Sequence, residues 1–307
     1  MRHFVGAVLV ISLGSFLLVS CSNPFQSDGD GEELEDAVWE SSGHEPKVFD
    51  ELFSNPDYSD HEALQQEDGL TERTDQVTEV ADLINDEKDL STIKEIQNLL
   101  YSIRTPEQSP ENTFEVSAAQ ILTTPVTGGC TTFATAFATL ARAKGIPAVV
   151  VDSARLKWIK EGSRIDTMVY GHFWVEVYIE DEWHLVDSTA GVLYENYDRS
   201  NWFLPEGRYS GYRYVAFSKS LSVIDTGATE ESHNLLQRVA FVKKDVDYID
   251  PDYPEVDLRD DDLEEDMKAD YEALDLDAND EFSIDTSGTV FTIEASSAPE
   301  DLQNISS

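Results

Sequence analysis

The pattern of apolar and polar positions along the chain predicts helices first and strands after them. Three segments have apolar side chains three or four positions apart, the period of an amphipathic helix: residues 77–84, 93–103 and 130–144. Gly145 and Pro147 end the third helix, because glycine suits the left-handed position after a helix and proline cannot continue one. The first residue of this third helix is a cysteine.

Beyond residue 147 the period becomes that of a β-strand. Residues 148–151 are a short apolar run, and residues 168–180 alternate, with His172, Trp174, Glu176 and Tyr178 on one side of the chain. A turn at Asp181 and Glu182 leads back into a strand over residues 183–187. The sequence therefore predicts an α+β fold, in which a helical N-terminal part, with the cysteine on a helix, packs on an antiparallel sheet.

The N-terminus has the features of an export signal. A short charged start is followed by an uncharged apolar run over residues 4–19, and the run closes with Leu18, Val19, Ser20 and Cys21. This ending resembles the lipobox of bacterial lipoproteins, which implies that residues 1–20 are a signal peptide and that Cys21 is acylated. The expected location is the extracytoplasmic face of a membrane, in the periplasm or at the cell surface. An ordinary signal peptide and a membrane anchor are the alternatives, although the run is short for a spanning helix.

Charge divides the chain into a nearly neutral middle and two acidic flanks. Residues 28–95 carry a net charge of −19 and residues 245–281 one of −16, whereas residues 96–244 carry only −3. We interpret residues 21–70 as an acidic tether, 71–247 as the folded domain and 248–307 as an acidic disordered tail. A habitat of high salt would also enrich acidic residues, but it should acidify the middle as well. No basic stripe is available to neutralise phosphates, which argues against a nucleic-acid partner.

The chain has two cysteines, Cys21 and Cys130. If Cys21 is acylated, Cys130 has no partner within the chain, and an unpaired thiol in an exported protein is a candidate reactive group. The positive end of the helix dipole at its position would stabilise a thiolate. The alternative is a small buried structural cysteine.

Three segments carry a resemblance to a known family. The first is Gly129, Cys130, Phe133 and Ala134 with residues 140–148; the second is the strand over residues 172–178; the third covers residues 183–189. Together they resemble the transglutaminase-like superfamily, over roughly residues 76–245. The resemblance implies a papain-like fold with Cys130 as the nucleophile, His172 as its base and Asp187 as the group that orients the imidazole.

The implied activity is acyl transfer or amide hydrolysis on a protein or peptide substrate through a thioester. The resemblance does not choose among transglutamination, deamidation and proteolysis. The backbone N–H of Cys130 is the expected first oxyanion donor, and Gln120 is a candidate for the second. The family often has a small residue after the histidine and a proline after the aspartate, whereas this chain has Phe173 and Ser188.

Other interpretations of these residues remain open. His184 could be the functional histidine in place of His172, and Asp187 could simply end a strand. The whole domain could be a non-catalytic module that binds a peptide or a cell-wall polymer through the aromatic-rich residues 191–217.

No cofactor or metal is expected from the sequence. It contains no zinc-ligand spacing, phosphate-binding loop or serine elbow. Asp275, Asp277 and Asn279 resemble the start of a calcium loop. However, Asp280 stands where the turn needs glycine, and Thr286 where a glutamate should bind.

Overall fold

The computed structural model describes residues 56–66, 69–104, 114–124, 129–155, 171–198, 203–204, 214–226 and 253–276. The predicted signal peptide, Cys21, most of the predicted tether and residues 277–307 lie outside these ranges. Within them, no helix has both the length and the apolar character needed to cross a membrane.

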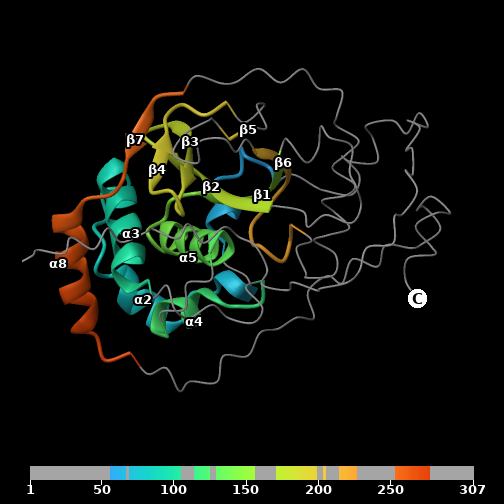
Figure 1. Ribbon diagram of the computed structural model, residues 1–307. Coiled ribbons are helices and arrows are strands. Elements are labelled where there is room, and N and C mark those ends of the chain that lie inside the picture. The colour runs from blue at the N-terminus through green and yellow to red at the C-terminus, as the bar shows by residue number, and fades with distance from the viewer. Residues whose placement is uncertain are drawn as a thin grey trace, which may run out of the picture.

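A group of helices and one antiparallel sheet make up the fold (Figure 1). The sheet has the order β5-β6-β1-β2-β3-β4-β7, and its neighbouring strands all run antiparallel. The strands are β1 (Ala148–Arg155), β2 (Gly171–Ile179), β3 (Glu182–Asp187), β4 (Val192–Tyr194), β5 (Phe203–Leu204), β6 (Tyr214–Ser220) and β7 (Glu255–Asp257). The helices are α2 (Asp75–Ala81), α3 (Leu90–Ile103), α4 (Ala118–Thr123), α5 (Cys130–Ala143) and α8 (Asp261–Glu272). The predicted α+β fold is confirmed.

The two faces of the central strand β2 bury different kinds of side chain. Phe173, Val175 and Val177 belong to the large apolar cluster that contains α3 and α5. On the opposite face Trp174 packs among residues of β1, β3 and β4. Farther along that face, the fully buried Glu176 forms an ion pair with Lys219, with 2.7 Å between Oε1 and Nζ. The predicted alternation therefore separates an apolar face under the helices from an aromatic and partly charged one.

Helix α5 is bounded by two glycines that adopt positive φ. Gly129 precedes the helix at φ 118° and ψ −155°, a region that side chains with a Cβ rarely enter. At the other end Gly145 adopts φ 71°, and the N–H of Ile146 donates to the carbonyl of Ala141 at 2.9 Å. This is the glycine-terminated helix end that the sequence predicts, and it turns the chain directly into β1.

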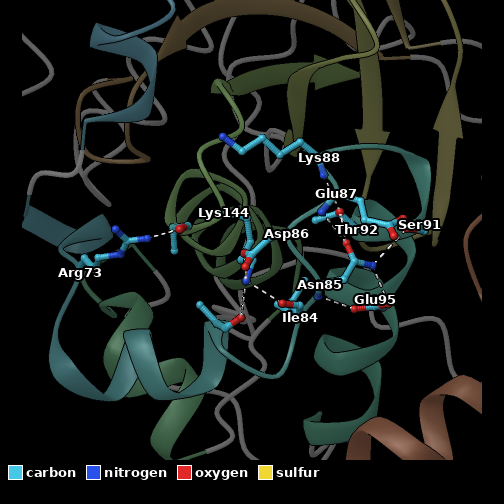
Figure 2. A network of polar contacts seen from close by, with 12 residues as sticks. Arg73, Ile84, Asn85, Asp86, Glu87, Lys88, Ser91, Thr92, Glu95 and Lys144 are labelled. Atoms are coloured by element: carbon cyan, nitrogen blue, oxygen red, sulfur yellow. Dashed lines mark hydrogen bonds and ion pairs between the residues drawn. The ribbon is translucent and has the colours of Figure 1, made fainter.

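Lys144, at the end of α5, also holds the end of α2 in place (Figure 2). Its buried Nζ donates to the carbonyl of Ala81, the last residue of α2, at 3.1 Å and to that of Ile84, three residues farther along, at 2.6 Å. Nζ also pairs with the exposed carboxylate of Asp86. Hydrogen bonding to Lys144, together with its charge, lowers the pKa of Asp86. One ammonium group thus supplies a donor to the Ile84 carbonyl and a second donor to the Ala81 carbonyl, which also accepts from the N–H of Ile84.

The last part of the predicted tether is not a tether. Leu64 and Leu70 are each 1% exposed, and the hydroxyl of Tyr58 donates to the buried carboxylate of Glu176. Burial, followed by the charge of the same carboxylate, raises the pKa of Tyr197 well above its usual value. The folded domain therefore begins before residue 71, because a few apolar side chains within the acidic flank reach the core.

The predicted disordered tail is wrong for residues 253–276. They form β7, which pairs with β4, and α8, which packs along α3 (Figure 1). Leu258 and Met267 are buried, and the side chain of Asn98 on α3 accepts from the N–H of Asp260 and donates to the carbonyl of Leu258. The acidic side chains of α8 are mostly exposed. Three of them lie in its first turn, where their negative charge interacts favourably with the helix dipole.

Candidate active site

Cys130 lies where the sequence predicts it, at the first position of α5, and is 1% exposed. The preceding Gly129 gives no side-chain cap. The first N–H groups of a helix have no partner within it, so this end offers donors to an anion.

His172 and Asp187 are in direct contact. Nε2 of His172 lies 2.9 Å from Oδ2 of Asp187, and both side chains are buried. Val175 pairs with Val186 across the ladder, so His172 and Asp187 project from the same face of the sheet, at adjacent ends of β2 and β3. Because a carboxylate only accepts, Nε2 carries the proton, and the lone pair of the neutral ring is on Nδ1.

A turn after β3 holds the Asp187 carboxylate in this orientation. Its other oxygen, Oδ1, accepts from the N–H of Thr189 at 3.2 Å and from that of Ala190 at 3.1 Å. The carbonyl of Asp187 accepts from the N–H of Gly191 at 2.8 Å. One oxygen is therefore fixed by the backbone, and the other is directed at the imidazole.

Chain direction brings the start of α5 toward the same end of the sheet. Only residues 144–147 separate α5 from β1, so the start of β1 lies at the end of α5. Helix α5 is about 21 Å long and β1 about 26 Å, and α5 packs on β1 and β2. The head of α5 consequently lies toward the end of β1, which pairs with the beginning of β2. Cys130 also shares an apolar cluster with Phe173, which follows His172 on β2 and projects from the opposite face of the sheet.

The sulfur of Cys130 is disulfide-bonded in this structure. The expectation of an unpaired Cys130 is therefore not met here. The other cysteine of the chain, Cys21, lies outside the described residues. Acylation of Cys21 and a disulfide at that residue exclude each other, because both use the same sulfur.

The structure weighs against two alternatives from the sequence. His184 points to the face opposite His172, and its Nε2 contacts the carbonyl of Ile179 at 3.3 Å. Gln120 completes a capping box at the start of α4, where its Oε1 accepts from the N–H of Ser117 at 2.9 Å. Neither side chain is directed at the His172–Asp187 pair in these contacts.

Sequence reasoning missed the residues that support His172. The ring of Tyr214 on β6 lies 4.9 Å from the imidazole, between centroids. The hydroxyl of Ser153 on β1 donates to the carbonyl of His172 at 2.6 Å. The pairing of β1 with both β2 and β6 brings these side chains together, and no local pattern indicates it. Among the described residues, no group of His, Cys, Asp and Glu could hold a metal ion.

Comparison with known proteins agrees with this architecture. The family model of the Transglutaminase-like superfamily matches residues 63–188, a span that contains Cys130, His172 and Asp187. No match was found among curated proteins. One similar solved structure is a chain from Cytophaga hutchinsonii, named as a candidate cysteine protease. It is 17% identical, with a TM-score of 0.36, over 59% of this chain and 51% of that one. That likeness is too low to support an argument about activity. Residues 63–188 are therefore the part of this chain that is similar to the Transglutaminase-like superfamily.

Proposed function

We propose that this protein is an extracytoplasmic cysteine enzyme that transfers or hydrolyses acyl groups of protein or peptide amides. The observation that carries the proposal is the buried 2.9 Å contact between His172 and Asp187, at the end of the sheet toward which α5 directs Cys130. A carboxylate that orients an imidazole next to a thiol is the arrangement that covalent acyl transfer requires.

The reaction follows from the orientation of the imidazole. Nδ1 of His172 accepts the thiol proton, and the thiolate of Cys130 attacks the carbonyl carbon of the amide. A C–S bond forms, the C–N bond breaks, and the imidazolium returns its proton to the leaving amine. Water or a second amine then attacks the thioester, and the thiol of Cys130 is released. Asp187 stabilises the imidazolium and fixes its tautomer throughout.

The oxyanion formed in both steps needs hydrogen-bond donors. The backbone N–H of Cys130 lies at the start of α5, where the helix dipole also favours negative charge. We assign this N–H as one donor. Gly129 orients this N–H, because its φ of 118° sets the direction in which the chain enters the helix.

The nucleophile requires the reduced state of Cys130. If Cys21 is acylated, its sulfur is a thioether and cannot form a disulfide. Cys130 then has no cysteine in this chain with which it could pair. We therefore propose that lipidation of Cys21 both anchors the protein on the extracytoplasmic face of a membrane and leaves Cys130 as a thiol. The apolar run and the Leu-Val-Ser-Cys ending at residues 18–21 support this.

Thiol reactivity tests the catalytic assignment. In a Cys21→Ala background Cys130 is the one thiol of the chain, and iodoacetamide should alkylate it at pH 7 roughly tenfold or more faster than an ordinary thiol, which is only a few per cent ionised there. His172→Ala should abolish the enhancement. His184→Ala is the matched control and should retain it, because Nε2 of His184 contacts the carbonyl of Ile179, at the end of β2 away from His172. Equal rates in all three proteins would overturn the catalytic assignment and leave a binding module as the alternative.

A second experiment tests the anchor. Cells fed a labelled fatty acid should transfer the label to the wild-type protein and not to the Cys21→Ala variant. Mass spectrometry of the mature N-terminal peptide should show an acylated Cys21. An unacylated peptide that is disulfide-linked to the peptide containing Cys130 would overturn this part of the proposal.

A further inference from the structure

Helix α3 contacts both sides of the candidate site through one side chain, Tyr101. The ring of Tyr101, which is 3% exposed, packs against Phe133 with 5.7 Å between ring centroids. Phe133 lies on α5 three residues after Cys130. The hydroxyl of Tyr101 donates to the carbonyl of Thr189 at 2.8 Å, in the turn that holds Asp187.

The turn after β3 is thereby held on two sides. The N–H of Thr189 donates to Asp187, and the carbonyl of the same residue accepts from Tyr101. One turn earlier on α3, Nε2 of Gln97 donates to the carbonyl of Ser188 at 2.8 Å. Gly191 closes the turn at φ 70°, and a Cβ there would lie only 3.0 Å from the Tyr101 ring. The turn thus fits closely onto this face of α3.

We propose that Tyr101 is a positioning residue, which sets the placement of the Asp187 turn relative to the Cys130 helix and so aims the Asp187 carboxylate at His172. This rests on the proposed function of these three residues. If Tyr101 loses its hydroxyl, the Thr189 carbonyl loses a fixed donor. The peptide group between Thr189 and Ala190, whose N–H donates to Oδ1 of Asp187, then gains freedom to rotate. The carboxylate then keeps its charge and loses its fixed direction.

The test compares two tyrosine-to-phenylalanine variants in the full, reduced chain with Cys21→Ala. Tyr101→Phe removes the hydrogen bond to Thr189. Tyr271→Phe is the matched control, because the hydroxyl of Tyr271 also donates to a backbone carbonyl, that of Leu122, outside the Asp187 turn. The first measurement is the rate of iodoacetamide alkylation of Cys130 between pH 5 and 9. The second is the NMR signal of the proton between His172 and Asp187.

Tyr101→Phe should slow alkylation at pH 7 roughly three- to tenfold, the effect of losing one hydrogen bond, and should move the pH profile toward that of an ordinary thiol. It should also shift or broaden the proton signal of the His172–Asp187 pair. Tyr271→Phe should leave both readouts as in the parent. Identical profiles and signals in the two variants would overturn the proposal. If the parent itself shows no enhanced alkylation, the proposed function fails, and the NMR signal alone still decides whether Tyr101 positions Asp187.

Discussion

Asp187 presents its two carboxylate oxygens to different partners, so the orientation of an asparagine in its place can be predicted. The N–H groups of Thr189 and Ala190 need an acceptor, and the amide oxygen would take the place of Oδ1. The amide NH₂ would then face Nε2 of His172 and move the ring proton to Nδ1. Asp187→Asn should therefore lower the alkylation rate of Cys130 at pH 7 about tenfold, to that of His172→Ala. A rate equal to that of the unsubstituted protein would mean that the His172 tautomer does not control the thiol.

At the residue scale, the family resemblance indicated all three proposed catalytic residues, but the residues that support them could not be predicted. Cys130, His172 and Asp187 stand next to local patterns: two glycines before a helix, and two alternating strands joined by a tight turn. The residues that hold them come from distant parts of the chain. Tyr101 precedes the turn it contacts by 88 positions, and its spacing on α3 marks only an apolar helix face.

Lys144 connects two helices, so its removal should act on both. Lys144→Met keeps most of the buried side chain and removes a donor from the Ile84 carbonyl and from the Ala81 carbonyl, which keeps the N–H of Ile84. A buried carbonyl that loses its donor costs about 1–3 kcal/mol, and we expect a loss of unfolding free energy in this range by urea titration. Lys268→Met is the control, since the exposed ammonium of Lys268 pairs with the exposed Glu272, and its loss should change stability by less than about 0.5 kcal/mol. Equal effects of the two substitutions would contradict the capping role.

The partner of this lysine gives a pH-dependent prediction. The hydrogen bond from Lys144 lowers the pKa of Asp86. Its contribution to stability is therefore complete above the unfolded carboxyl pKa of about 3.9 and is lost as the pH falls through the lower folded value. Asp86→Asn should lower the urea midpoint slightly at pH 7, and the difference from wild type should shrink toward pH 3. The effect should be small because Asp86 is exposed. A difference that does not depend on pH would exclude this ion pair as its cause.

At the scale of whole elements, periodicity predicted α5 and the β2–β3 hairpin, and charge misled the interpretation of the flanks. Leu263, Met267 and Tyr271 recur every four positions on α8, which is a helical stripe. The same helix carries seven acidic residues, so its average composition is strongly polar and indicates disorder. Packing depends on one face of a helix, and average composition does not distinguish the faces. On α3, Thr92 and Glu95 have the spacing of a capping box. Asp89 caps the helix instead, and Glu95 binds Asn85.

In the whole molecule, segments outside residues 63–188 complete the fold around the candidate site. The N–H of Leu258 donates to the carbonyl of Gly191 at 3.0 Å, directly after the turn that holds Asp187. Strand β7 pairs with β4, and Asn98 ties the start of α8 to α3. The C-terminal segment thus covers the same turn that Tyr101 contacts from α3.

Two truncations test whether β7 and α8 belong to the folding unit. A chain that ends after residue 276 keeps both elements, whereas one that ends after residue 252 loses them and exposes the faces of α3 and β4 that they cover. We expect the longer chain to unfold at the melting temperature of the full protein. The shorter one should melt several degrees lower or fail to fold, since burying Leu258 and Met267 alone is worth about 3–6 kcal/mol. Leu258→Ala in the full chain provides an intermediate case, with an expected loss of about 2–4 kcal/mol. Equal melting temperatures for the two truncated chains would show that the domain ends before β7. In that case the Asp187 turn would be held by α3 and its own backbone alone.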